Sequence, residues 1–360
     1  MNAATALEGK RVCVCAGAGG VGKTTTSAAL AVGMAARGLK VAVVTIDPAK
    51  RLANSLGLEE LGNEPRRVDP ARFSDHGVEI KGELWALMLD SKRTFDALIE
   101  RLAPDEATRD EVLSNRIYQQ LSSAVAGSQE FTAIAKLYEL DQEGDYDLLV
   151  LDTPPSRNAL DFLDAPGRLT GFFQGRAIKM FLRPAGIGGR LLGRGTGVVF
   201  GLVERITGVD LIHDLSVFFR ALSGMVDDFT ERARLVGALL TDPGTTFLIV
   251  TAPRHDPVEE AIFFHTKLDD AGMPFGGLVV NRVHTAPEGD IPDGLDEELA
   301  RRVTTAAHEL SALAEREAAS LERLRTRLGD PPTIVVPELD GDVHDVEGLA
   351  LMRGHLFAGD

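Results

Sequence analysis

Apolar residues in this sequence gather into short, nearly continuous runs, and most stretches between the runs have helical spacing. The first run, 10–15, is followed by a glycine-rich segment. An alanine-rich helical stretch over 24–37, ended by Gly38, then leads to a second run over 40–46. Unbroken apolar runs of this length are typical of strands buried on both faces of a parallel sheet. The pattern therefore predicts a strand–helix–strand unit near the start of the chain.

Five further apolar runs follow, and helical segments separate most of them. They lie at 84–89, 147–151, 246–251, 277–281 and 333–336. This alternation predicts an α/β fold built on a doubly wound, mainly parallel sheet. The charged helical pattern within 285–330 predicts a solvent-facing helix before the last strand.

Two helix-rich stretches, 92–143 and 159–240, are too long to be simple connections between strands. We expect them to pack together as an inserted helical lobe. The sheet domain then comprises the three remaining segments, which are residues 1–91, 144–158 and 241–360. A chain of 360 residues is long enough for one large core that carries such an insertion.

The composition is that of a globular protein, with 44% apolar and 26% charged residues. A formal net charge of -16 repels nucleic acid over most of the surface, so we expect no nucleic-acid partner. Neither a signal peptide nor a membrane-spanning run is evident, which predicts a cytoplasmic protein, with contact to a membrane surface left open. The two cysteines, Cys13 and Cys15, are expected to be small buried side chains of the first strand.

Residues 17–24, Gly-Ala-Gly-Gly-Val-Gly-Lys-Thr, have the pattern of a phosphate-binding loop. They directly follow a predicted strand and open a predicted helix, which is the context that the mechanism of such a loop requires. Lys23 is expected to reach the β- and γ-phosphates of ATP, and the Thr24 hydroxyl to ligate Mg²⁺. The predicted nucleotide-binding residues of the loop are Gly19, Gly20, Val21, Gly22, Lys23, Thr24 and Thr25. The alternative is a glycine-rich turn without a ligand.

Two aspartates follow predicted strands and are candidates for the chemistry at the γ-phosphate. Asp152 ends an apolar strand. An aspartate that holds Mg²⁺ directly or through water occupies such a position at a strand end. Asp47 follows the second strand and could orient or deprotonate the attacking water. The alternatives are a cap after the strand for Asp152 and an Asp-Pro turn for Asp47.

Three motifs in this chain resemble those of the anion-transporting ATPase family, which includes the arsenical pump-driving ATPase and the targeting factor for tail-anchored membrane proteins. The family is one of the deviant Walker A proteins. The motifs are Gly-Gly-Val-Gly-Lys-Thr-Thr at 19–25, Asp-Pro-Ala at 47–49, and Asp-Thr-Pro-Pro-Ser at 152–156 with Asn-Ala-Leu at 158–160. They stand in the family's order, and the resemblance covers the sheet from about residue 10 to 350.

The resemblance implies ATP hydrolysis at a dimer interface, with Asp47 activating water in switch I and Asp152 in switch II. It also implies that Asn281 reads adenine, that the adjacent Arg282 is nucleotide-binding, and that Pro337 belongs to the loop on the adenine side. The family's lobe moves with nucleotide state and, in the targeting branch, forms an apolar groove for a client helix. A hydrophobic client is therefore one expected partner.

Three departures from the family's pattern change these expectations. Ala18 occupies the place of the signature lysine, which crosses the dimer to the partner's phosphates. A homodimer would lack that charge unless Lys50, Arg51 or Arg157 replaces it, so we hypothesise a heterodimer with a paralogue that carries the lysine. The Cys-x-x-Cys pair of the targeting factor is absent, and buried cysteines make an arsenite site unexpected.

The stretch 166–208 is unusual for an acidic chain, because it holds eleven glycines and seven basic residues against one acidic residue, Glu204. It could meet an acidic membrane or an amphipathic helix, or it could be ordinary lobe core with solvated arginines. The leading hypothesis is an ATPase whose nucleotide state drives the lobe on a protein or membrane-associated client. The alternative is a weakly hydrolysing or non-hydrolysing regulatory subunit of a heteromeric complex.

Overall fold

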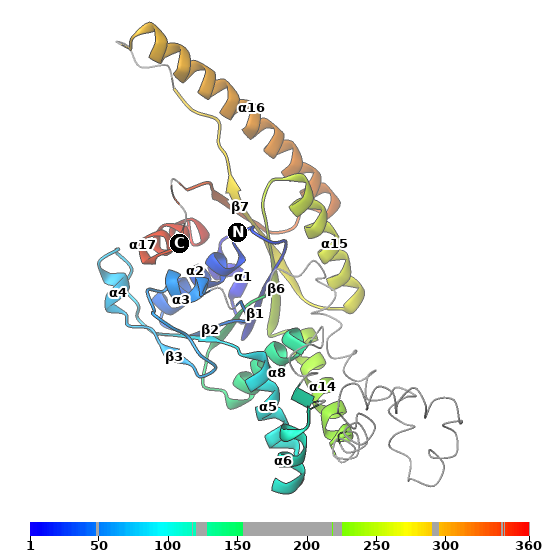
Figure 1. The fold of residues 1–360 in the computed structure, drawn as a ribbon. Coiled ribbons are helices and arrows are strands. Elements are labelled where there is room, and N and C mark those ends of the chain that lie inside the picture. Colours follow the sequence, from blue (N-terminus) through cyan, green and yellow to red (C-terminus); the bar gives the residue numbers. More distant parts are fainter. Residues whose placement is uncertain are drawn as a thin grey trace, which may run out of the picture. The chain divides into compact units, whose positions relative to one another are not determined.

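An eight-stranded sheet organises the chain in the computed structural model (Figure 1). The structure describes residues 1–47, 50–116, 118–119, 128–153, 218, 225–289, 295–339, 341 and 343–359. The strands are β1 (Val12–Ala16), β2 (Lys40–Thr45), β3 (Arg66–Arg67), β4 (Glu83–Met88), β5 (Leu148–Asp152), β6 (Thr245–Thr251), β7 (Phe275–Val283) and β8 (Thr333–Pro337). The seven strands predicted from the sequence are confirmed, with ends shifted by at most two residues.

The strand order is β3-β4-β2-β5-β1-β6-β7-β8, and every neighbouring pair is parallel except β3 with β4. The predicted doubly wound, mainly parallel sheet is thereby confirmed. All residues of β1, β5 and β6 are buried, which explains why these strands appear in the sequence as unbroken apolar runs. The short antiparallel edge strand β3 was not predicted.

Helices cover both faces of the sheet. The helix α2 (Lys23–Ala36) shares one hydrophobic core with α1 (Ala3–Leu7), α3 (Arg51–Ser55) and α17 (Val346–Leu356), and Cys13 and Cys15 of β1 lie in it. The helix α15 (His255–Ala271) buries its own apolar residues outside that core, against β6 and β7. Small residues let α2 approach its neighbours closely, since a side chain on Gly33 would overlap the ring of Phe357.

The helix α16 (Glu297–Arg327) is mostly exposed, and only Glu317 and Leu324 are buried in it. Glu317 accepts a hydrogen bond from the backbone N–H of His284 over 2.8 Å and contacts the His284 ring nitrogen at 3.0 Å. The predicted solvent-facing helix within 285–330 is confirmed, and this buried carboxylate fastens it to the end of β7.

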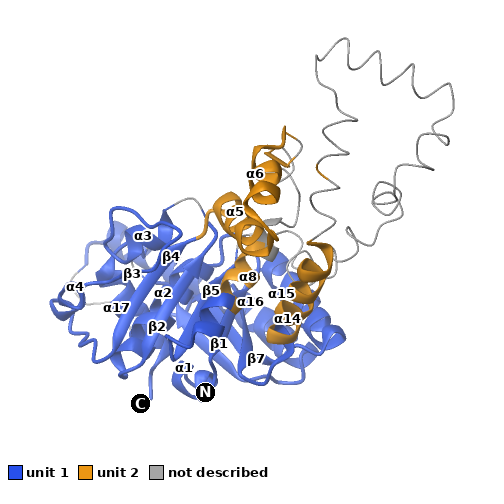
Figure 2. Ribbon diagram, turned by 90° about the horizontal axis from the view of Figure 1, so that it is seen from below, with its two compact units in different colours: residues 1–88, 139–160, 240–360 blue, residues 89–138, 161–239 orange. Residues whose placement is uncertain are grey.

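The chain divides into two compact units, coloured separately in Figure 2. Unit 1 comprises residues 1–88, 139–160 and 240–360 and holds the sheet together with the short helix α4 (Ala71–Ser74). Unit 2 comprises residues 89–138 and 161–239, and its chain includes α5 (Ser91–Leu102), α6 (Glu106–Ser114) and most of α8 (Ser128–Glu143) and α14 (Val226–Thr241). The lobe bounds predicted from the sequence remain a prediction, and the stretch 166–208 lies outside the described residues.

Within unit 2, aromatic side chains from distant parts of the sequence pack together. Phe95 stacks on Phe229 at a centroid distance of 6.1 Å and contacts Tyr118 at 6.2 Å. The Tyr118 hydroxyl donates to Asp96 over 2.5 Å, so the buried polar atom of this ring is satisfied. Unit 2 therefore has an aromatic core of its own.

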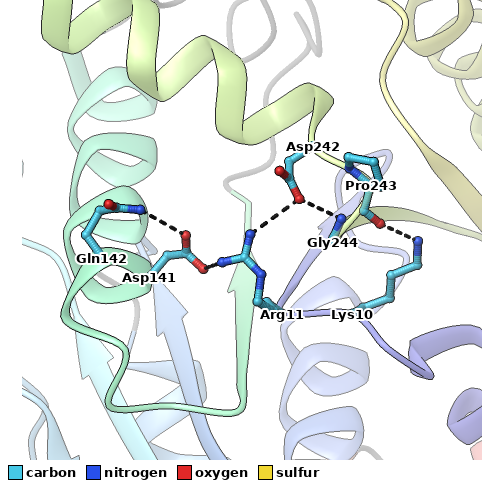
Figure 3. Close-up of polar contacts among 7 residues, drawn as sticks. All are labelled: Lys10, Arg11, Asp141, Gln142, Asp242, Pro243 and Gly244. Carbon is cyan, nitrogen blue, oxygen red and sulfur yellow. Dashed lines mark hydrogen bonds and ion pairs between the residues drawn. The ribbon is translucent and has the colours of Figure 1, made fainter.

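Arg11, just before β1, contacts the two segments in which the chain re-enters unit 1, at Asp141 and at Asp242 (Figure 3). Its guanidinium donates to the Asp141 carboxylate and, over 3.3 Å, to Asp242. Asp242 also accepts from the backbone N–H of Gly244 over 2.7 Å, and the backbone carbonyl of Gly244 accepts from the N–H of Arg11. The strand that leads into the phosphate loop is thus held to two segments far away in the sequence.

Candidate nucleotide site

The loop between β1 and α2 has the backbone of an anion-binding turn. Gly20 and Gly22 have φ angles of +76° and +92°, in the left-handed region that favours glycine. Gly17, at φ +147°, packs so closely that a Cβ atom would lie 2.0 Å from the carbonyl oxygen of Val250. No side chain caps the N-terminus of α2 at Gly22, so the first N–H groups of the helix face the loop as potential phosphate donors.

Lys23 folds back over this loop. Its ammonium donates to the carbonyl oxygens of Gly17 over 2.9 Å and Ala18 over 2.7 Å, and the residue is only 6% exposed. Burial lowers the pKa of Lys23, although the charge of Asp152 acts in the opposite direction. A buried cation that is held by two carbonyl dipoles lies ready for an anionic ligand.

Asp152 is the last residue of β5 and lies beside the start of α2. One carboxylate oxygen accepts from the hydroxyls of Thr24 over 2.7 Å and Thr45 over 2.8 Å. Among the described residues, none donates a hydrogen bond to the other oxygen, although it is buried. Burial raises the pKa of Asp152 to about 6, while the two hydroxyls and the charge of Lys23 act to lower it.

These atoms fit a hard divalent cation. Mg²⁺ prefers oxygen ligands and is usually held by one or two carboxylates together with phosphate and water. The buried, unpaired oxygen of Asp152 next to the Thr24 hydroxyl supplies such a start. The part of the chain that the structure describes holds no cluster of three His, Cys, Asp or Glu side chains, so a second, all-protein metal site is not found there.

Asp47 lies just after β2, and its neighbours place it at the same edge of the sheet. Its backbone N–H donates to the Thr45 hydroxyl over 3.2 Å, so Thr45 bridges Asp47 and Asp152. The guanidinium of Arg51 lies 3.6 Å from the Asp47 carboxylate. Residues 48–49 and 154–217, and with them Arg157, lie outside the described residues.

The residues predicted to contact the base lie at the ends of β7 and β8. The Asn281 side chain donates to the carbonyl oxygen of Val21 over 2.9 Å, and its own oxygen accepts from the N–H of Arg282. The same side chain fills the space beside Gly22, where an added Cβ would lie 2.4 Å from the amide nitrogen. Asn281 therefore contacts the phosphate loop directly, and its role in reading a base stays a prediction.

A cavity of about 420 Å³ joins these elements within unit 1. Its lining brings together most of the predicted site residues from the phosphate loop, from Asp47 and from the ends of β7 and β8. The lining residues at issue are Gly20, Gly22, Lys23, Thr24, Thr25, Asp47, Asn281, Arg282 and Pro337. Asp152 lies beneath them and contacts the cavity through Thr24. Thr45 was not predicted as a site residue, because a threonine inside a strand is an ordinary β-forming residue.

Other features bear on the remaining expectations. Cys13 and Cys15 are fully buried, as expected for the first strand. Ala18 is buried and carries no charge at the loop. Among the helices that the structure describes, none is long and apolar enough to cross a membrane.

Comparison with known proteins adds a family to this geometry. Residues 10–297 match the sequence profile described as "Anion-transporting ATPase". The "Putative arsenical pump-driving ATPase 1" of Aquifex aeolicus is 26% identical over 280 residues, which cover 76% of this chain and 63% of the relative. The "ATPase ARSA1" of Chlamydomonas reinhardtii is 28% identical over 76% of this chain and 35% of its own length. The "ATPase GET3" of Malassezia globosa is 26% identical over a match that covers 76% of this chain and 73% of the relative. The match thus spans less than two thirds of the first two relatives.

Proposed function

The chain belongs to the anion-transporting ATPase family, and from that premise we propose that it binds ATP with Mg²⁺ at residues 17–24 and hydrolyses it. The nucleotide state then drives unit 2 to act on a protein or membrane-associated client. The relatives named above are called ATPases, and one is named for driving an arsenical pump. The client and the direction of coupling are proposed for this chain and not taken from those names.

One observation carries the proposal. A buried carboxylate oxygen of Asp152 has no donor among the described residues, and it lies beside a threonine hydroxyl at the uncapped start of α2. Leaving a buried charge half-solvated is costly unless a ligand completes the site. A Mg²⁺ ion bound together with ATP would balance the negative charge of the Asp152 carboxylate, and it would also neutralise the phosphates during hydrolysis.

The chain's own residues take the following roles. Lys23 binds the β- and γ-phosphates, Thr24 and Asp152 hold the metal directly or through water, and Asp47 orients the attacking water. The backbone of Gly19, Gly20, Val21 and Gly22, with Thr25, surrounds the phosphates. Asn281, Arg282 and Pro337 form the base side of the cavity.

Ala18 bears on the partner. A cation supplied across an interface can accelerate phosphoryl transfer by roughly 10³ to 10⁵. Because residue 18 is alanine, we propose a heterodimer with a paralogue that has a lysine there, and a homodimer with slow turnover is the alternative. Native mass and co-purifying chains, determined after gentle purification, separate these two assemblies.

Steady-state phosphate release tests the hydrolysis. The full chain should release phosphate from ATP only with Mg²⁺, and Lys23→Ala should abolish the release. Ala18→Lys should accelerate the isolated chain if the missing charge limits it. Brisk turnover that is indifferent both to residue 18 and to an added paralogue would contradict the heterodimer.

A second candidate follows from the same alanine. The chain could bind ATP without significant hydrolysis and regulate a catalytic partner. Turnover of the assembled complex that survives Lys23→Ala in this chain alone would favour this role. Loss of turnover in that experiment would favour the catalytic one.

A further inference from the structure

The described residue Arg51 lies beside the proposed water-activating carboxylate of Asp47. Arg51 is the first residue of α3, and its guanidinium nitrogen lies 3.6 Å from a carboxylate oxygen of Asp47. Both residues line the 420 Å³ cavity, together with Thr24 and Thr25 of the phosphate loop. A delocalised cation therefore borders the cavity in which ATP is proposed to bind, on the side of Asp47.

The pair is too weak to be a structural fastening. The Arg51 side chain is 65% exposed, while that of Asp47 is 14% exposed. Because the Arg51 end of the pair is mostly in water, solvent weakens the attraction, and such pairs change an equilibrium by only about twofold to fivefold. Arg51 can therefore leave Asp47 readily when a better anion enters the cavity.

The neighbouring cations are placed differently. The ammonium of Lys50 lies 4.0 Å from the Glu60 carboxylate, and Lys50 does not line the cavity. Lys23 is buried and already donates to two carbonyl oxygens of the loop. Arg51, by contrast, lines the cavity and forms an ion pair with Asp47.

We infer that Arg51 is a catalytic residue supplied by the chain itself: it exchanges the Asp47 carboxylate for the terminal phosphate oxygens of ATP. This inference rests on the proposed function, and Arg51 acts in addition to the lysine that the proposed paralogue supplies, not in its place. Arg51 then stabilises the charge that develops on the transferred phosphoryl group, as an arginine of the same chain does in some nucleotide hydrolases. The exchange also releases the Asp47 carboxylate from this ion pair, so that it can accept a hydrogen bond from the attacking water. One displacement thus couples phosphate binding to activation of the nucleophile.

Binding of a transition-state mimic tests the inference without relying on turnover. The affinity of the full chain for ADP is measured with Mg²⁺, first alone and then with aluminium fluoride, by competition against a fluorescent ADP. Variants Arg51→Ala and Arg51→Lys are compared with Lys50→Ala, an adjacent cation that points elsewhere. Arg301→Ala serves as a second control, because Arg301 is similarly exposed and paired with Glu298 on α16.

Arg51→Ala should bind ADP within about twofold of the wild type but lose most of the gain from aluminium fluoride. An effect of about 10³-fold on that gain corresponds to a catalytic arginine. Arg51→Lys should keep part of the gain, because the charge remains while the planar fork is lost. Both control variants should behave as the wild type.

Two results would overturn the inference. One is an Arg51→Ala protein with the full wild-type gain, and the other is a wild type that binds ADP but gains nothing from aluminium fluoride. A wild type that binds no nucleotide at all would instead contradict the proposed function.

Discussion

Replacing Asp152 with asparagine should stabilise the nucleotide-free protein at pH 7.5, although it removes a site residue. Asp152 is 1% exposed, and burial raises its pKa from the ordinary 3.8 to about 6. At about 1.4 kcal/mol for each unit of pKa, keeping this carboxylate charged costs about 3 kcal/mol of folding free energy. In the variant, the buried amide nitrogen has no acceptor, and this costs about 1 kcal/mol. The variant should therefore gain about 2 kcal/mol.

The sign of the pH dependence follows from the direction of the shift. Because the folded-state pKa lies above the unfolded one, the cost is absent below pH 3.8. It grows between pH 3.8 and about 6 and is complete above that value. The advantage of Asp152→Asn should be largest at pH 7.5 and should disappear by about pH 4.

Urea unfolding at several pH values measures this difference. Asp147→Asn is the matched control, because Asp147 precedes the same strand and accepts the backbone N–H of Lys40 over 2.7 Å. That variant also removes a carboxylate charge, but not the unfavourable buried charge of Asp152, so it should not gain stability. Saturating ATP with Mg²⁺ should stabilise the wild type more than Asp152→Asn. An Asp152→Asn protein that is less stable than the wild type at pH 7.5, or a difference independent of pH, would show that the buried carboxylate does not destabilise the nucleotide-free protein.

Three further substitutions test other contacts. Gly17→Ala places a Cβ atom 2.0 Å from the Val250 carbonyl oxygen and should lower the free energy of unfolding, measured by heating, by about 2–4 kcal/mol. Its control, Gly20→Ala, places the Cβ atom in open space and should cost about 1 kcal/mol. Equal losses in the two variants would contradict the close packing at Gly17. Arg11→Met removes both carboxylate contacts of a half-exposed guanidinium and should cost about 1–2 kcal/mol, compared with less than about 1 kcal/mol for Arg325→Met, whose pair with Asp330 is exposed. Thr45→Val removes the bridge between Asp47 and Asp152 and should raise the Mg²⁺ concentration for half-maximal nucleotide binding about tenfold. Thr45→Ser keeps the hydroxyl and should keep the wild-type value. A wild-type Mg²⁺ requirement in Thr45→Val would show that the bridge is dispensable.

Local patterns were sufficient to predict the sheet and the phosphate loop. Strands buried on both faces appear as unbroken apolar runs, and the glycine spacing before Lys23 is tied to a backbone that only glycine adopts easily. The positions of Asp47 and Asp152 at strand ends followed from the same reasoning, because β2, β5 and β1 are neighbours in a parallel sheet.

Contacts between distant parts of the sequence could not be predicted in this way. Arg11 meets carboxylates that are 130 and 231 residues away, and nothing in its local sequence distinguishes it from a solvated cation. The two-residue strand β3, Arg66–Arg67, has no apolar alternation. Asn281 was predicted to read a base, yet its contact with the loop carbonyl of Val21 depends on a register between β7 and the loop that no local pattern encodes.

Calorimetric titration of ATP into the purified chain, with and without Mg²⁺, determines whether residues 17–24 bind ATP. We expect one site per chain, binding that depends on Mg²⁺, and loss of that binding in Lys23→Ala, while Lys50→Ala binds as the wild type does. Absence of binding at millimolar ATP, or equal binding by Lys23→Ala, would contradict this expectation.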